Sequence, residues 1–410
     1  MGEQAHGEAL PRVCGITFAK QFPSSAEPLR GLFVLRQVLA TADVVDWRVI
    51  APVPVAPRGF ERLLKRPAVA LHETVEGLSV AHPGYRVLPR RLDYGRAGAS
   101  MAAAAGRAFD QALDQGAQFV HAHALYPSGA AARMLAKPNG VPYIVTVHGS
   151  DLYTMLSRPE WTALVRDVVA DAAVVVCVSN RLADDVAANL SVDRSVILVI
   201  PDAYDDHTYR FSRRTMRATE DPVRIVCVGR LEPPKGPDIL VEAMALLRDA
   251  ATPVRLALVG GGSLDRQLRS RVERLGLGDR VDFTGPLPPD RIAHVLADAD
   301  LYVQPSRREG FGVALVEAMA TGLPAVATAS GGPADIVGPG DGMLVQPGDA
   351  AALAEGIAEV VGRLGDFDSA AIAERIASRF SPAIVGERLV HLYYDVLSGQ
   401  KPSGDSQTTG

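Results

Sequence analysis

The sequence predicts an α/β protein made of two doubly wound domains, each a parallel sheet covered by helices on both faces. The chain has 410 residues, more than one hydrophobic core usually supports, so two domains of ordinary size are expected. Hydrophobic residues make up 48% and charged residues 22%, close to the globular average. Short β-branched runs alternate with helical stretches through most of the length, which is typical of parallel sheets.

Six apolar runs in the first half predict the strands of one sheet, and six in the second half predict another. The expected strands of the first half are 13–18, 47–50, 119–123, 143–147, 174–178 and 196–200. Helices are expected between them at 29–40, 99–113, 129–135 and 180–188. The expected strands of the second half are 224–228, 254–259, 281–283, 301–303, 325–327 and 343–345.

This pattern predicts an N-terminal domain at 1–202 and a C-terminal domain at 223–382. The polar segment 203–222 has no clear apolar period and is expected to be the linker. The amphipathic segment 383–397 is expected to pack back on the first domain, and the polar tail 398–410 to be disordered. Ligands of such folds bind outside the carboxyl ends of the strands, so the loops there are the expected sites.

Charge and cysteine content exclude several classes of protein. The formal net charge is -5, and the basic residues are scattered, so a nucleic-acid partner is not expected. Cys14, Cys177 and Cys227 each lie inside an apolar run, which indicates core residues and neither a disulfide framework nor a zinc site.

The sequence also lacks the signals of a membrane or secreted protein. No apolar run approaches the roughly 18 to 20 residues that span a bilayer, and residues 1–10 lack the apolar stretch of a signal peptide. A cytoplasmic location is therefore expected. The segment Arg58 to Arg66 combines basic and apolar residues, which suits either peripheral contact with a membrane or bulky acceptor, or a solvated helix face.

The most informative segment is SRREGFGVALVEAMATG, from Ser306 to Gly322, which follows an apolar strand and opens a helix near Gly312. A helix N-terminus offers backbone N–H groups and a positive dipole end to an anion. Glu317 lies in an otherwise apolar helix, so its carboxylate needs hydrogen-bond donors to offset the cost of burial. The hydroxyls of a ribose would supply them, and so would an Arg side chain or a neighbouring loop.

Glu309, the Gly-Phe-Gly that follows it, and Glu317 eight positions later resemble the signature of retaining glycosyltransferases of the GT-B fold, family 4, also called glycosyl transferases group 1. The resemblance extends in order over almost the whole second domain. Its further motifs are VGRLEPPKG (228–236), VGGG (259–262), VDFTGPL (281–287), DADLYVQPS (298–306), GLPAVAT and SGGPADIV (330–337). It implies two Rossmann-like domains that face each other across a cleft and hold a nucleotide sugar.

The resemblance also implies roles for individual residues. Arg230 and Lys235 would contact the donor diphosphate, Glu309 would orient the transferred sugar, and Glu317 would bind the ribose. With His148, the first three form the expected catalytic set. The full donor-binding set that it implies is Gly229, Arg230, Lys235, Gly285, Pro286, Leu287, Glu309, Gly310, Phe311, Gly312, Val313 and Glu317.

The implied reaction moves a sugar from a nucleoside-diphosphate sugar to an acceptor hydroxyl with retention of anomeric configuration. UDP is favoured over GDP and dTDP on family grounds. A departing diphosphate develops negative charge, which fixed cations and helix N–H groups can stabilise without a metal. No cofactor is expected, and the departing phosphate itself is expected to accept the proton of the acceptor hydroxyl.

The first domain carries a weaker version of the same resemblance. An HGSD loop follows a predicted strand, and its His148 resembles the family histidine that approaches the sugar, although a structural hydrogen bond is the other possibility. Asp151 would either grip an acceptor hydroxyl or cap a helix. His121 and His123 share a strand face, yet no third ligand lies at metal-site spacing, which leaves His123 as an acceptor-site candidate.

The sequence departs from the family pattern in two places. The usual Gly-Gly pair before the first helix is replaced by FAKQFPSSAEPLRG, with Gly31 alone, so Arg30 is a candidate substitute contact. The usual Asn-Gly after Pro201 is replaced by Asp202 and Ala203. Alternatives to a transferase are a non-hydrolysing UDP-sugar epimerase of the same architecture and a nonenzymatic nucleotide-sugar-binding protein. The sequence predicts neither the acceptor nor the oligomeric state.

Overall fold

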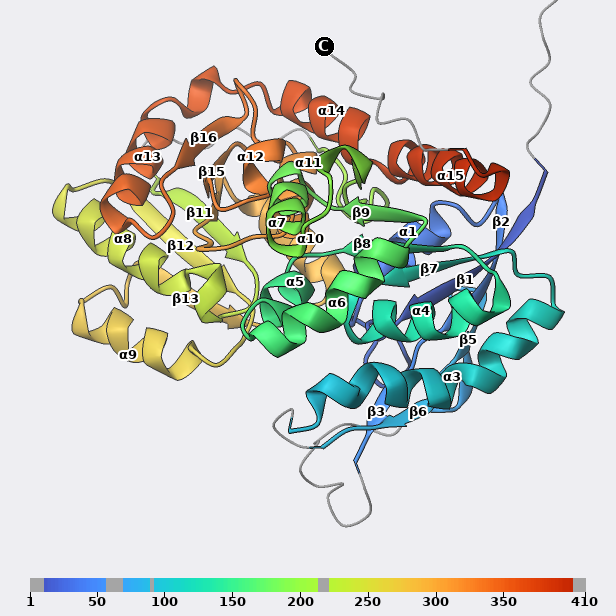
Figure 1. Cartoon of the computed structure of the whole chain (residues 1–410). Helices are drawn as coiled ribbons and strands as arrows, with labels where there is room; N and C mark the ends of the chain where they lie inside the picture. The colour runs from blue at the N-terminus through green and yellow to red at the C-terminus, as the bar shows by residue number, and fades with distance from the viewer. Residues whose placement is uncertain (1–10, 57–68, 89–91, 213–220, 401–410) are drawn as a thin grey trace, which may run out of the picture. The chain divides into compact units, whose positions relative to one another are not determined.

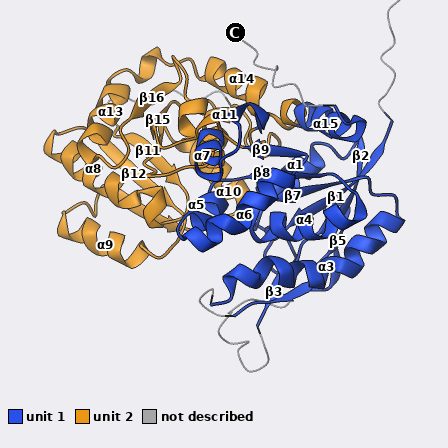
Figure 2. Cartoon of the chain, viewed as in Figure 1, with its two compact units in different colours: residues 1–177, 183–200, 386–410 blue, residues 178–182, 201–385 orange. Residues whose placement is uncertain are grey.

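The computed structural model describes residues 11–56, 69–88, 92–212 and 221–400, and the chain divides into two compact units (Figure 1, Figure 2). The first unit comprises residues 1–177, 183–200 and 386–410, and the second comprises 178–182 and 201–385. The segment Arg58 to Arg66 and the end of the tail, 401–410, lie outside the described residues.

The first unit contains an eight-stranded sheet in the order β10-β9-β8-β7-β1-β2-β5-β4. All neighbours are parallel except β4 and β5. The strands are β1 (Val13–Ala19), β2 (Val45–Ile50), β4 (His72–Val75), β5 (Leu78–Ala81), β7 (Phe119–His123), β8 (Tyr143–Val147), β9 (Val174–Cys177) and β10 (Ile197–Val199). A separate parallel pair is formed by β3 (Val53–Val55) and β6 (Gly84–Arg86).

Helices connect these parallel strands, as crossover connections require. They are α1 (Leu32–Leu39), α3 (Ala97–Asp114), α4 (Ala130–Ala136), α5 (Ser150–Met155), α6 (Pro159–Asp171) and α7 (Asn180–Leu190). The last helix, α15 (Pro382–Ser398), belongs to this unit from Gly386 onward. Its Tyr393 stacks on Phe119 of β7 and meets Trp47 of β2 edge-on, so the end of the chain completes the core of the first unit.

The second unit contains a six-stranded parallel sheet in the order β13-β12-β11-β14-β15-β16. Its strands are β11 (Val223–Val228), β12 (Val254–Val259), β13 (Val281–Gly285), β14 (Leu301–Gln304), β15 (Ala325–Thr328) and β16 (Gly342–Val345). Its helices are α8 (Pro237–Asp249), α9 (Asp265–Arg274), α10 (Pro289–Asp298), α11 (Val313–Ala320), α12 (Pro333–Ile336), α13 (Ala350–Gly362) and α14 (Ser369–Phe380).

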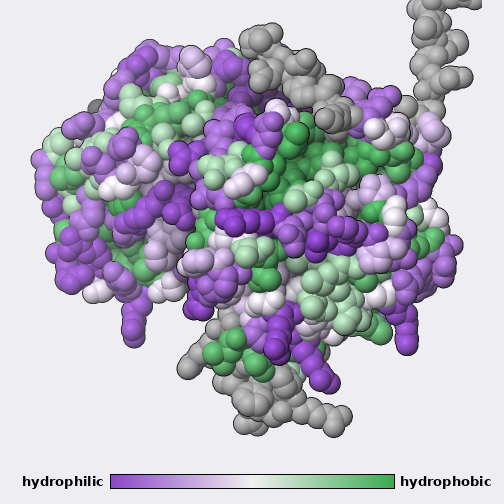
Figure 3. Space-filling model, in the orientation of Figure 1, coloured by the Kyte–Doolittle hydropathy of each residue, from purple (hydrophilic) through white to green (hydrophobic). Residues whose placement is uncertain are grey.

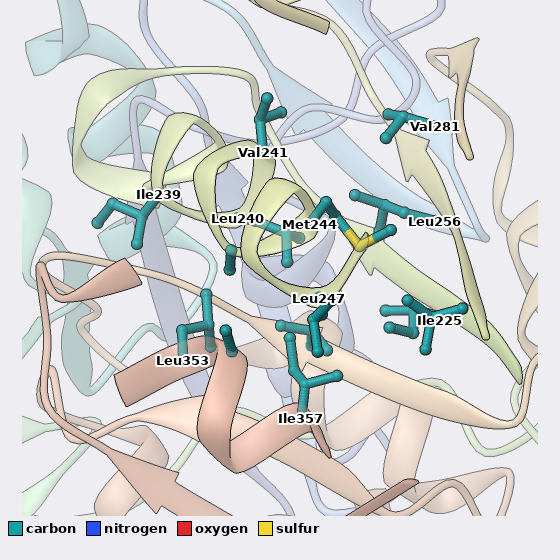
Figure 4. Close-up of a cluster of buried hydrophobic side chains, with 14 of the residues drawn as sticks. Ile225, Ile239, Leu240, Val241, Met244, Leu247, Leu256, Val281, Leu353 and Ile357 are labelled. Carbon is teal, nitrogen blue, oxygen red and sulfur yellow. The ribbon is translucent and has the colours of Figure 1, made fainter. Parts of the chain in front are cut away.

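The core of the second unit lies where α8 and α13 cover one face of its sheet. Figure 4 shows Leu240, Met244 and Leu247 of α8 beside Leu353 and Ile357 of α13, and all five are at most 2% exposed. The helix α9 buries only its apolar stripe, and hydrophilic residues cover much of the surface around it (Figure 3). This alternation of apolar and polar faces is what makes the helices pack on the sheet.

The predicted fold class is confirmed: both units are Rossmann-like α/β structures with parallel sheets. All twelve predicted strands exist, with bounds that differ by at most two residues. Four short strands were missed, β3, β4, β5 and β6. They span three or four residues each and are largely half-exposed, so they carry no sustained apolar run.

The predicted linker at 203–222 differs from what the structure has. Its described start, up to Ser212, groups with the second unit, and Ala203 and Tyr209 are 0% and 2% exposed. The backbone N–H of Tyr204 donates to the carbonyl of Phe380, at the end of α14. Buried aromatic side chains therefore attach this segment, which its polar composition had concealed. Residues 213–220 lie outside the described part.

Two neighbouring leucines of α8 provide a matched test of this core. Leu247 is 2% exposed and lies in the cluster, whereas Leu246 is 43% exposed. We expect Leu247→Ala to lower the free energy of unfolding by about 2 to 5 kcal/mol, because it leaves a cavity, and Leu246→Ala by less than about 1 kcal/mol. Urea unfolding followed by circular dichroism measures both, and equal losses would contradict this packing.

Candidate functional site

The second sheet has a topological switch point between β11 and β14. From β11 the chain adds β12 and β13 on one side, and β14, β15 and β16 follow on the other side. The loops that leave β11 and β14 therefore run in opposite directions, which is the position where doubly wound folds bind their ligands. Both loops carry residues that the sequence singled out.

Lys235 and Glu309 meet at this switch point. Lys235 ends the turn Pro233–Lys235 after β11, and Glu309 lies in the loop after β14. The ammonium Nζ of Lys235 lies 2.8 Å from Oε1 and 2.6 Å from Oε2 of Glu309. Their side chains are 30% and 11% exposed, so the carboxylate is largely withdrawn from water while the ammonium keeps access to it.

The backbone fixes the loops that carry this ion pair. Gly236 has φ +65°, and a Cβ there would lie 2.0 Å from the carbonyl oxygen of Pro305, so only glycine allows this approach. Arg307 donates two hydrogen bonds to Asp238, at 2.6 and 2.7 Å, and these hold the pKa of that carboxyl below its usual value. The backbone N–H of Arg307 also donates to the carbonyl of Pro234.

Glu309 has further hydrogen-bond donors that the sequence analysis did not single out. The Ser306 hydroxyl lies 3.1 Å from Oε2, and the side-chain amide of Gln304 lies 3.3 Å from the same oxygen. The backbone of Glu309 is also fixed, because its N–H donates to the carbonyl of Ser330 and its carbonyl accepts from Gly332. The sequence feature that could have pointed to Gln304 is its position, since it is a polar residue at the end of an otherwise apolar strand.

The helix α11 begins directly after this loop, as the sequence predicted. Its N-cap is Gly312, with φ +118° and no side-chain cap, so backbone N–H groups are left for a ligand or solvent. Glu317 lies just over one turn along α11 and is 8% exposed, in agreement with the expected buried helix. Phe311 and Gly312 are buried, and Gly310 and Val313 are half-buried.

Arg230 is exposed and directly follows Gly229 in the loop after β11. Hydrogen bonds fix this loop to its neighbour: Leu231 donates to the carbonyl of Gly261, and Glu232 accepts from the hydroxyl and N–H of Ser263. The loop after β12 in turn contacts the end of β13. The N–H of Gly260 donates to the carbonyl of Gly285, and Pro286 and Leu287 follow directly. The predicted donor residues thus share one edge of the sheet.

The first unit holds three histidines close together. His123 is 3% exposed, and its Nδ1 lies 3.3 Å from Nε2 of His148, at the end of the neighbouring strand β8. Burial, followed by the nearby charges of His121 and His148, holds the pKa of His123 well below its usual value, so the ring stays neutral. His123 is therefore a buried, neutral side chain in contact with His148.

Both ring nitrogens of His121 are occupied. Nδ1 lies 2.8 Å from the hydroxyl of Tyr393 in α15, and Nε2 lies 2.7 Å from that of Thr146. Burial lowers the pKa of His121 to about 3. Among the described residues, no group of three or more His, Cys, Asp or Glu side chains is placed to hold a metal ion.

Asp151 neither caps its helix nor faces outward. It is 9% exposed, and its carboxylate accepts the backbone N–H groups of Leu125 at 2.8 Å and His148 at 3.1 Å. The N-cap of α5 is Gly149, without a side-chain bond. Asp151 thereby joins the loops after β7 and β8, and it positions His148.

Arg30 forms a local contact in the loop before α1. Its guanidinium lies 2.7 Å from the carboxylate of Glu27, and its side chain is 17% exposed. The adjacent Gly31 caps α1, and a Cβ there would lie 2.3 Å from the carbonyl oxygen of Gln21. Gly31 thus allows the end of this loop to pack against its beginning at Gln21.

Within the described ranges, no helix is long and apolar enough to cross a bilayer.

Two family descriptions match the chain. Residues 209–363 match the Glycosyl transferases group 1 family, and residues 45–203 match the Glycosyl transferase 4-like domain. TuaC, a glycosyltransferase assigned to teichuronic acid biosynthesis in Bacillus subtilis, is 31% identical over 350 residues, which cover 82% of this chain and 86% of TuaC. The 2-deoxystreptamine glucosyltransferase of Streptomyces kanamyceticus is 35% identical over 273 residues, or 62% and 68% of the two chains.

Solved structures share the fold at low identity. Sucrose-phosphate synthase of Thermosynechococcus elongatus has a TM-score of 0.75 at 20% identity, over 95% of this chain and 100% of that one. HepE of Anabaena, solved in complex with UDP-glucose, has a TM-score of 0.69 at 20% identity, over 93% and 99%. Of the functions that the sequence left open, glycosyl transfer is the one that the sequence relatives carry.

The buried histidines make the stability of the first unit depend on pH. The unfolded chain protonates His121 as the pH falls below about 6.5, whereas the folded chain keeps it neutral down to about 3. Stability is therefore present above pH 6.5 and is lost as the pH falls, by about 2 kcal/mol at pH 5. Urea unfolding at pH 7.5 and pH 5 measures this loss.

Two variants isolate this contribution. We expect the loss between the two pH values to be smaller by about 2 kcal/mol in His121→Gln than in the wild type, because glutamine does not titrate. His72→Gln, at an exposed position, serves as the control and should keep the wild-type dependence. The same pH dependence in all three proteins would contradict a neutral His121.

Proposed function

Since this chain belongs to the glycosyl transferases group 1 family, with the GT-B fold, we propose that it transfers a sugar from a UDP-sugar to an acceptor hydroxyl. The transfer retains the anomeric configuration and uses no metal ion. The UDP donor is supported by HepE, which was solved with UDP-glucose, and by the donor residues that match the family motifs. Retention is supported by the resemblance of Glu309 and Glu317 to the signature of retaining enzymes.

The observation that carries the proposal is the contact of Lys235 with Glu309 at the switch point. When no nucleotide sugar is bound, the Lys235 ammonium and the Glu309 carboxylate neutralise each other's charge. When the donor binds, Lys235 turns to the diphosphate, and Glu309 accepts hydrogen bonds from hydroxyls of the sugar. The N-terminus of α11 adds backbone N–H groups for the phosphate oxygens, and Arg230 adds a second positive charge.

The chemical step needs no protein group that forms a covalent bond to the sugar. The bond from the anomeric carbon to the diphosphate oxygen breaks, and its electron pair stays on that oxygen. The acceptor oxygen attacks the anomeric carbon from the same face, and its proton passes to the departing diphosphate oxygen. Lys235 and Arg230 stabilise the charge that develops there, which is the largest contribution that such a site makes. By the family resemblance alone, His148 is the residue proposed to contact the transferred sugar.

Substitution of the ion pair tests this assignment. We expect Lys235→Ala and Glu309→Ala each to lower kcat at least about 100-fold, because each removes an interaction with the transition state. A matched control is Glu242→Ala, which breaks the exposed Arg271–Glu242 pair on α8 and α9 and should keep wild-type turnover. Both site variants should keep the thermal stability of the folded chain within a few degrees.

Turnover is measured as UDP release from UDP-glucose, with 2-deoxystreptamine and D-inositol 3-phosphate, the acceptors named for relatives of this chain, in the panel. NMR of the product reports the anomeric configuration, and EDTA tests the need for a metal. A wild-type rate in Lys235→Ala or Glu309→Ala would contradict the catalytic role assigned to the substituted residue. An inverted product would overturn retention, and loss of activity in EDTA would overturn metal independence.

Donor choice has its own test. A ligand present at 100 times its Kd stabilises the folded protein by about 2.7 kcal/mol. In a thermal-shift screen of UDP-, GDP- and dTDP-sugars, we expect UDP-sugars to raise the Tm most, and Lys235→Ala to remove most of that shift. A larger shift with GDP- or dTDP-sugars would reassign the nucleotide.

A further inference from the structure

A buried amide lies at the end of the central strand β14. Gln304 is 5% exposed, whereas the three residues before it, Leu301, Tyr302 and Val303, are fully buried. A buried amide costs free energy unless hydrogen bonds satisfy it. A strand that is covered on both faces would be more stable with an apolar residue here, so the contacts of Gln304 need an explanation.

The two ends of this amide have different partners. One end lies 3.3 Å from Oε2 of Glu309, and the other lies 3.4 Å from the hydroxyl of Tyr302, which also lies 3.3 Å from the carbonyl oxygen of Val228. A carboxylate only accepts hydrogen bonds, so the amide nitrogen must face Glu309 and the amide oxygen must face Tyr302. Burial, followed by the charges of Cys227, Glu309 and Glu317, raises the pKa of Tyr302 well above its usual value, so its hydroxyl keeps the proton that it donates.

The two oxygens of Glu309 are therefore not equivalent. Among the described residues, Oε2 receives hydrogen bonds from Gln304, Ser306 and Lys235, whereas Oε1 receives one from Lys235 alone. Once Lys235 turns to a diphosphate, Oε2 keeps two donors and Oε1 loses its only one. The carboxylate then stays in place and presents Oε1 to a new hydroxyl.

Gly312 leaves the room that this arrangement needs. A Cβ at that position would lie 3.1 Å from the amide nitrogen of Gln304 and 3.7 Å from Cγ of Glu309. Its φ of +118° is also one that other residues rarely adopt. The glycine before α11 thus serves the amide as well as the helix N-terminus.

We propose that Gln304 is a positioning residue, which holds Oε2 of Glu309 so that Oε1 faces the transferred sugar. This inference rests on the proposed function, because it assigns the sugar hydroxyls to Glu309. On the other side, the amide oxygen and the carbonyl of Val228 share the single hydroxyl proton of Tyr302. Gln304 touches no substrate itself, and it acts through Glu309.

The test compares the binding of UDP-glucose with that of UDP, because only the sugar reaches Glu309. Isothermal titration calorimetry on the full chain gives both values of Kd for the wild type, Gln304→Met, Glu309→Gln and the double variant. Methionine is similar in length to glutamine and lacks both the donor and the acceptor. We expect Gln304→Met to weaken UDP-glucose about 5- to 10-fold and to change UDP by less than twofold. In the Glu309→Gln background, it should cause no further loss.

A second variant reports on the charge at this position. Gln304→Glu keeps the shape and places a carboxyl against Glu309, so UDP-glucose binding should fall at pH 8 and recover toward pH 5.5, where the introduced carboxyl can donate a proton. A purely structural role would not produce this recovery. Thermal unfolding of each variant confirms that the chain is folded.

The outcomes separate this inference from the proposed function. If the wild type binds UDP-glucose no better than UDP, and Glu309→Gln changes nothing, the proposed function fails and this inference fails with it. If Glu309→Gln loses the preference for UDP-glucose but Gln304→Met does not, the proposed function stands and the positioning role is overturned. Equal losses of UDP and UDP-glucose in Gln304→Met also overturn it.

Discussion

The ion pair between Lys235 and Glu309 is the interaction on which the site depends. A carboxylate that is largely withdrawn from water needs donors, and three side chains supply them, from the ends of β11 and β14. Such a pair adds little to stability, because the cost of desolvation offsets much of the attraction. In the proposed function the pair acts by exchange, because an ammonium that keeps access to water can move to a phosphate while the acid stays fixed. The glycine contacts between the loops keep both groups at that distance.

The sequence predicted the strands well where they are buried on both faces. The run VVVC, for example, is apolar and buried at every position, so it is recognisable as a strand that is covered on both faces. The hairpin of β4 and β5 was missed because HETV and LSVA look like loop sequence. Its turn, Glu76 and Gly77, has two positive φ angles, and the glycine was the available signal. Glutamate is uncommon at the first of these positions, which hid the turn.

The sequence singled out the candidate site residues one by one but did not predict their contacts with one another. Lys235 and Glu309 are separated by 74 residues, and their contact depends on β11 lying next to β14, an order that periodicity does not reveal. Gln304 lay within the motif DADLYVQPS but was assigned no role, and Asp151 was expected either to grip an acceptor hydroxyl or to cap a helix. In both cases the side chain satisfies a partner from another loop. Motif matching singles out candidate ligand contacts more readily than the residues that position them.

The loops of Glu309 and His148 are held in different ways, which explains why the second unit carries the more recognisable motifs. In the second unit, backbone atoms approach so closely that only glycine fits, and glycines leave a recognisable pattern in the sequence. In the first unit, the loop of His148 is held by the carboxylate of Asp151, and His121 of the neighbouring strand is held by Tyr393 from the last helix. Side-chain bonds of this kind can be replaced by others of similar geometry. The loops of the first unit can therefore vary while its fold persists, and no short motif in them identifies a ligand.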